Sequence, residues 1–105
     1  MDADFDKLKQ MMGERVIDPQ GHVIGKVAQI AYEPNAFRAE WLVLKTSRFG
    51  RQQRLVPIDA VRNEGRTIWV PFPKDVVMGA PVPAVPTTPA GTEAVALQAH
   101  YRVAA

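Results

Sequence analysis

The stretch GERVIDPQGHVIGKV, residues 13–27, decides the class of fold in this chain of 105 residues. Its first part, Arg15–Asp18, has the pattern of a short β-strand. Pro19–His22 follows with proline early and Gly21 late, which is the order that a tight turn needs. From Val23 to Tyr32 the chain is strand-like again and rich in β-branched residues. The stretch therefore predicts a β-hairpin in which Gly21 supplies the turn conformation.

Gly25 interrupts the alternation of the second strand. Ile24 and Val27 are three positions apart, so in a regular strand they would face opposite sides of the sheet. A β-bulge at Gly25 would turn both towards the interior, and bulges also bend strands around barrel corners. We therefore expect Gly25 to have a positive φ or to lie against neighbouring backbone.

Further short strands are expected downstream, at residues 40–45, 54–57 and 67–72. Pro57 ends its strand or places that strand at a sheet edge, because proline lacks the N–H that a sheet ladder uses. Residues 58–61 suit a turn of helix, and residues 63–66 suit a hairpin turn. Five or six short strands within about 60 residues predict an all-β protein, built as a small antiparallel barrel or sandwich.

The flanks of this β domain have a different composition. Residues 1–12 are expected to form an N-terminal turn or a short helix, and the β domain is expected over residues 13–81. Residues 82–91 form a proline-rich linker, since fixed φ angles and missing N–H groups block both helix and sheet. Residues 92–105 are expected to form a short C-terminal helix or tail.

The sequence holds little that could support catalysis or a metal site. There is no cysteine and one serine, Ser47, and the two histidines, His22 and His100, are far apart. The carboxylates are scattered, with no pair set apart for acid–base chemistry. We predict no catalytic residues, no metal and no cofactor, and therefore no enzyme. The acidic start and the lack of about 18 consecutive apolar residues predict no signal peptide, no transmembrane segment and a cytoplasmic location.

The charge is uneven along the chain. Residues 45–66 hold six cations against two carboxylates, a local net charge of +4 within a chain of net +2. One reading is an RNA-binding or other anion-binding surface. Its candidates are Arg48, Arg51, Arg54, Arg62 and Arg66. The other reading is a solvated sheet face whose charges protect strand edges from pairing, and the modest charge favours this second reading.

The order of these features resembles the PRC-barrel family. The opening stretch follows the pattern G-x-x-V-x-D-x-x-G-x-x-I-G-K-V, which is typical of the family's first hairpin. Phe49-Gly50 with Leu55–Val61, and then Ile68–Val77, resemble its later segments, so the likeness spans residues 12–81. The family includes the cytoplasmic domain of the photosynthetic reaction centre H subunit. It also includes a domain of a ribosome maturation factor that binds a small-subunit ribosomal protein.

The resemblance implies a six-stranded, partly open barrel, as in stand-alone bacterial members, that binds proteins and often self-associates. The chain lacks the membrane helix of the reaction-centre subunit and the RNA-binding barrel of the ribosome factor, so neither specific role is carried over. We expect a non-catalytic adaptor that binds an unknown protein partner and forms a homodimer. The candidate interface residues are Trp41, Val43, Trp69, Leu97 and Tyr101. Nucleic-acid binding through residues 45–66 is the alternative.

Overall fold

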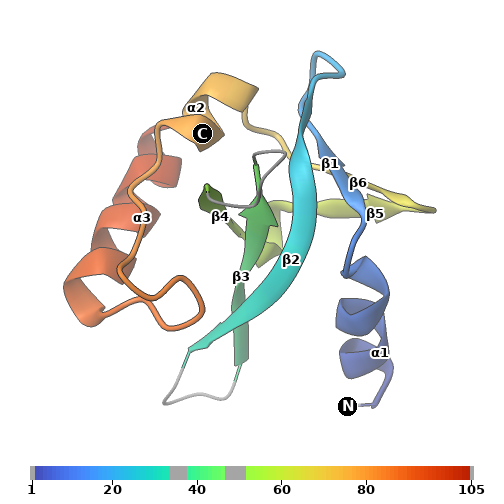
Figure 1. The fold of residues 1–105 in the computed structure, drawn as a ribbon, viewed down its shortest axis with the longest axis horizontal. Coiled ribbons are helices and arrows are strands. Elements are labelled where there is room, and N and C mark those ends of the chain that lie inside the picture. Colours follow the sequence, from blue (N-terminus) through green and yellow to red (C-terminus); the bar gives the residue numbers. More distant parts are fainter. Residues whose placement is uncertain (1, 34–37, 47–51, 105) are drawn as a thin grey trace.

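The computed structural model describes residues 2–33, 38–46 and 52–104, and Figure 1 traces their path. Helix α1 precedes the sheet, a 3-10 turn η1 joins two strands, and helices α2 and α3 follow. The elements are α1 (Asp2–Met11), β1 (Arg15–Ile17), β2 (Val23–Glu33), β3 (Arg38–Lys45), β4 (Gln53–Pro57), η1 (Ile58–Ala60), β5 (Arg62–Glu64), β6 (Thr67–Trp69), α2 (Lys74–Met78) and α3 (Gly91–Ala104).

The strands form one six-stranded sheet in the order β4-β3-β2-β1-β6-β5. Strand β2 is long and curved, and the sheet bends around a core without closing (Figure 1). Six strands, an open barrel-like sheet and a C-terminal helix confirm the predicted fold. One pairing departs from the predicted antiparallel order, because β6 lies parallel to β1. Strand β6 follows β5 through a hairpin turn and is antiparallel to it. On its other side, β6 runs in the same direction as β1.

The first hairpin contains the predicted turn and bulge. Gly21 has φ of 87°, the left-handed conformation that glycine adopts at no steric cost. In the pairing of β1 with β2, Val16 faces Gly25 and Ile17 faces Val23, so Ile24 is the extra residue of the bulge. Gly25 does not have a positive φ. Instead, a Cβ there would collide with the backbone carbonyl oxygen of Lys45 on β3, so close backbone approach explains the glycine.

Asp18 is the one buried charged side chain among the described residues. Its Oδ1 accepts the backbone N–H groups of Gln20 and His22 at 3.0 and 2.8 Å. Its Oδ2 accepts the backbone N–H of Lys74 at 2.9 Å and lies 3.2 Å from His22 Nδ1. Burial alone would raise the pKa of this carboxyl, but the hydrogen bonds from His22 and Lys74 outweigh burial and lower it. Asp18 thus joins the hairpin turn to the start of α2.

Helix α3 covers the opposite side of the sheet from α1 (Figure 1). Leu97 and Tyr101 of α3 are buried in the core. At the start of the helix, Glu93 accepts the backbone N–H groups of Ala84 and Ala90, each at 2.8 Å. A glutamate at the third helical position that reaches back in this way is a capping interaction. Glu93 therefore ties the proline-rich linker to the helix that follows it.

Candidate functional site

Four of the five predicted interface residues are buried inside the protomer. Trp41, Val43, Leu97 and Tyr101 all belong to the core, and Trp69 is half-buried. These four side chains are therefore not exposed anchors in the single chain, and their part in an interface stays a prediction. Helix α3 folds back onto its own sheet and buries Leu97 and Tyr101 there.

Tyr101 holds this tail in place. Its ring lies 4.6 Å from that of Phe72 and 6.4 Å from that of Trp41, measured between centroids. Its hydroxyl donates a hydrogen bond to the carbonyl oxygen of Leu55 on the edge strand β4. Burial raises the pKa of Tyr101 well above its ordinary value, so the hydroxyl keeps its proton. Nearby, His100 Nε2 donates to the carbonyl oxygen of Val76 at 2.8 Å, joining α3 to α2.

The structure describes three of the five arginines in the predicted basic surface. Arg48 and Arg51 lie outside the described residues. Arg54 is half-buried on β4, where Nε donates to the carbonyl oxygen of Met78 at 3.0 Å. Arg62 lies on β5, at the other edge of the sheet, and pairs with Glu64 at 2.9 Å. Arg66 is exposed in the turn that follows. Arg54 therefore supports the fold, and the anion-binding role of the three described arginines stays a prediction.

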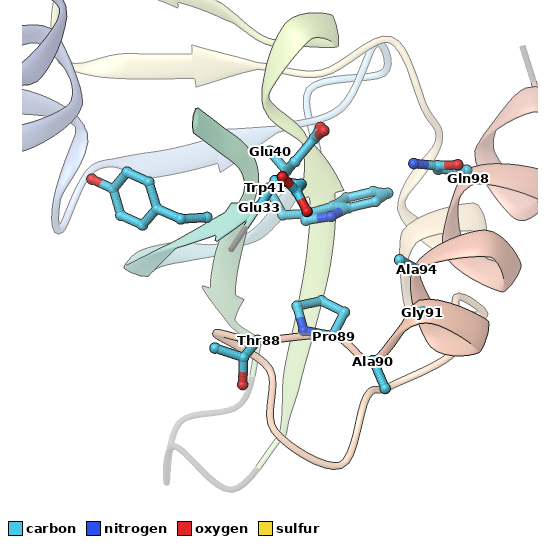
Figure 2. A pocket seen from close by; sticks show the side chains of 10 residues that line it. Glu33, Glu40, Trp41, Thr88, Pro89, Ala90, Gly91, Ala94 and Gln98 are labelled. Atoms are coloured by element: carbon cyan, nitrogen blue, oxygen red, sulfur yellow. The ribbon is translucent and has the colours of Figure 1, made fainter. Parts of the chain in front are cut away.

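A hollow of about 390 Å³ opens between strands β2 and β3 and the tail, and we call it the tail groove. Figure 2 shows Trp41 on the strand side, with Pro89 and the first turn of α3 opposite. The strand side carries carboxylates and the helix side is mostly small and apolar. The lining residues are Tyr32, Glu33, Glu40, Trp41, Thr88, Pro89, Ala90, Gly91, Ala94 and Gln98.

Glu40 at the tail groove forms a salt bridge with Arg38. Glu40 Oε1 accepts a hydrogen bond from Arg38 Nη2 at 3.0 Å. This bond with Glu40, together with the negative charge of the same carboxylate, raises the pKa of Arg38. The strand wall of the groove therefore carries a carboxylate, Glu40, in a salt bridge with Arg38. The Arg38 side chain is exposed to solvent, whereas that of Glu40 is mostly covered.

Tyr32 separates the tail groove from a second hollow of about 370 Å³. The second hollow is lined by helix α1, strand β2 and the linker, and its residues are Leu8, Lys9, Met12, Gln29, Ile30, Tyr32 and Thr87. Tyr32 is 40 % exposed and Met12 is 43 % exposed. We call Tyr32, Met12 and the two hollows the Tyr32 surface. A large aromatic side chain with space on both sides has the shape of an interface anchor.

Sequence reasoning missed Tyr32, because irregular strand register breaks simple alternation along β2, at Val27/Gln29 and at Ala31/Tyr32. Ala31 is fully buried, whereas its neighbour Tyr32 is exposed. The sequence analysis weighed the two tryptophans as outward candidates instead. Trp41 is buried and Trp69 half-buried, so the exposed aromatic lies elsewhere.

The described residues contain no cluster of three or more metal-ligating side chains. His22 lies against Asp18, and His100 donates to Val76, so each has a contact within the fold. Ser47 lies outside the described residues. The Tyr32 surface offers apolar contacts and hydrogen-bonding groups to a partner. Within residues 2–33, 38–46 and 52–104, no helix has the length and apolar content needed to cross a membrane.

Comparison with known proteins gives one family match. The model of the PRC-barrel domain matches residues 3–77. No curated protein matches the chain. The matched region contains all six strands and most of α1 and α2. The linker and helix α3, which form one wall of the tail groove, lie beyond it.

Proposed function

The chain belongs to the PRC-barrel family, and on this premise we propose that it is a non-catalytic adaptor that binds a protein partner through the Tyr32 surface. Domains of this family are in general protein-interaction modules and are generally non-catalytic. The proposal adds a place on this chain for that interaction, at the junction of strand β2, helix α1 and the linker.

The exposed ring of Tyr32 between two hollows is the observation that carries the proposal. Among the exposed large apolar side chains of the described residues, Tyr32 is the aromatic one, and the others are Met12 and five valines. Burial of apolar surface in an interface contributes about 25 cal/mol per Å². Aromatic side chains also lose little conformational entropy when they are fixed, which is why they dominate interface energetics.

A tagged pull-down from the native cell, at two salt concentrations, tests this proposal. Proteins retained by the chain are identified, and each is then tested against Tyr32→Ser and Val103→Ser. Val103 is 88 % exposed at the end of α3 and serves as the matched control. The affinity for a genuine partner should fall at least about tenfold with Tyr32→Ser, as for an interface hot spot, and stay unchanged with Val103→Ser. Equal loss or equal retention in both variants would contradict the proposal.

Self-association is the second part of the proposal. Leu97 and Tyr101 are buried against their own sheet, so a dimer built on them requires exchange of helix α3 between two copies. The linker between α2 and α3 supports such an exchange, because it contains four prolines, Pro81, Pro83, Pro86 and Pro89. Light scattering at micromolar concentration should give the mass of a dimer. A monomer across that range would rule out this part alone.

RNA binding through residues 45–66 is the alternative, and the same pull-down tests it. Stained nucleic acid in the low-salt eluate, absent at high salt, would favour the alternative. Arg54 and Arg62 already have partners inside the fold, the carbonyl oxygen of Met78 and the carboxylate of Glu64, and this argues against an anion-binding role for the two.

A further inference from the structure

Three cationic residues lie next to one another across the middle of the sheet. Arg15 on β1 pairs directly with Lys26 on β2, and Lys26 pairs directly with Lys45 on β3. Residues directly opposite in adjacent strands have side chains on the same face. The neighbours Val16, Val27 and Leu44 are buried, so the three cations face solvent. We call Arg15, Lys26 and Lys45 the cation row.

This arrangement works against the stability of the sheet. Like charges directly opposite in neighbouring strands destabilise the pairing. None of the ion pairs found within the described ranges involves a member of the cation row. The next positions along the same row are the uncharged residues Thr67 on β6 and Gln53 on β4. None of these direct sheet neighbours carries a charge that offsets the repulsion. Residues that lower the stability of a fold in this way are typical of binding sites.

The cation row lines a hollow of about 670 Å³, together with Lys74. Lys74 begins helix α2, and the bond from its backbone N–H to the buried Asp18 fixes its position beside the hairpin. Gly25 also belongs to the lining, and its missing side chain lets the backbone of β3 at Lys45 approach closely. Four cations from three strands and one helix thus surround one concave surface. The remaining lining residues are Val23, Ile24 and Thr46.

We propose that this hollow binds an acidic segment, rich in Asp and Glu, of a partner protein. This rests on the proposed function as a protein-interaction module and adds a second surface, at the opposite end of β2 from Tyr32. Adjacent strands are about 4.8 Å apart, so the cation row spans about 10 Å, which two or three neighbouring carboxylates of an extended peptide cover. Val23, 44 % exposed, gives such a peptide an apolar contact.

The lining favours a peptide over a nucleic acid. Single-stranded nucleic acids bind by stacking bases on aromatic side chains alongside the phosphate contacts. Within the described lining of this hollow there is no aromatic residue. Carboxylates need only the cations and hydrogen-bond donors that the hollow contains.

Fluorescence anisotropy with a labelled hexaglutamate peptide tests the inference directly. We expect binding that weakens as salt rises, and a loss of at least tenfold in affinity with Lys26→Gln. Lys7→Gln is the control, because Lys7 is exposed on helix α1 and lines none of the hollows described above, and it should leave binding unchanged. No binding, or equal effects of the two substitutions, would overturn the inference.

A hexathymidylate of similar charge is the competing probe. If it binds as tightly as hexaglutamate and responds to Lys26→Gln in the same way, the surface is a nucleic-acid site and the inference is wrong.

Lys26→Gln should also raise the melting temperature at low salt, because it relieves repulsion within the cation row. A lowered melting temperature would mean that Lys26 stabilises the fold. Tyr32→Ser should leave hexaglutamate binding intact, so failure at this hollow is separable from failure at the Tyr32 surface.

Discussion

At the Val23 end of strand β2, Asp18 and Gly25 are committed to holding the hairpin against α2 and β3. At the other end, Tyr32 projects between two hollows and is 40 % exposed. Strand β2 therefore connects two different regions. The fold requires the buried groups near its Val23 end, but it does not require the exposed ring of Tyr32 at the other end. The difference separates two questions, because substitutions of the buried groups at the first end should change stability, whereas substitutions of the exposed Tyr32 should change binding.

Asp18→Ala should give the largest loss of stability. The substitution leaves the backbone N–H groups of Gln20, His22 and Lys74 without their acceptor. Each unsatisfied buried donor costs about 1–3 kcal/mol, and partial access of water should keep the total near 3–4 kcal/mol. Urea unfolding measures this loss, with Asp59→Ala on the exposed surface as the control. A loss no larger than that of the control would show that Asp18 does not join the hairpin to α2.

The same carboxylate should make stability depend on pH. Its pKa in the folded chain is lower than the ordinary value of 3.8, so the stabilisation is complete above that value. It declines as pH falls through 3.8 towards the folded pKa, because the unfolded chain then binds the proton first. Unfolding free energies between pH 6 and pH 3 should fall more steeply for the wild-type chain than for Asp18→Ala. Parallel curves would contradict the lowered pKa.

Gly25→Val should cost about 2–3 kcal/mol, the range for a side chain forced into filled space. The new Cβ would meet the carbonyl of Lys45, which is backbone and cannot turn aside. Gly91→Ala is the matched control, since a Cβ at Gly91 meets nothing within 4 Å. Thermal melting should therefore separate the two, with the Ala variant unchanged or more stable. Equal melting temperatures would mean that β2 and β3 can move apart with no loss of stability.

Tyr101→Phe should have the smallest effect, about 1 kcal/mol. It removes the hydroxyl that donates to Leu55 and keeps the ring between Phe72 and Trp41. Tyr32→Phe, which changes an exposed ring, is the control and should leave unfolding unchanged. If the two phenylalanine variants unfold alike, the hydroxyl of Tyr101 does not contribute to holding the tail.

The hairpin was predictable because its determinants are local. The turn, the bulge and the inward positions of Ile24 and Val27 follow from spacing within residues 13–27. The hydrogen bond of Asp18 to Lys74 was not predictable, since 56 positions separate the two residues. The face shared by Leu97 and Tyr101 was visible in the sequence, but which sheet it packs on was not.

Charge was the least reliable guide. Residues 45–66 are basic along the sequence, yet Arg54 and Arg62 lie on opposite edge strands. The cation row joins Arg15, Lys26 and Lys45, which are spread over the first half of the chain. Strand register brings these residues together, and the bulges shift that register, so counting along the sequence does not reveal the row.

The most direct test of the central claim is backbone amide hydrogen exchange, measured on the chain alone and with the protein partner captured by the pull-down. Binding at the Tyr32 surface predicts slowed exchange around Gln29–Tyr32 and in the 87–91 segment that lines the two hollows. Slowed exchange elsewhere, with no change in either of these segments, would contradict the account and assign the partner to another face.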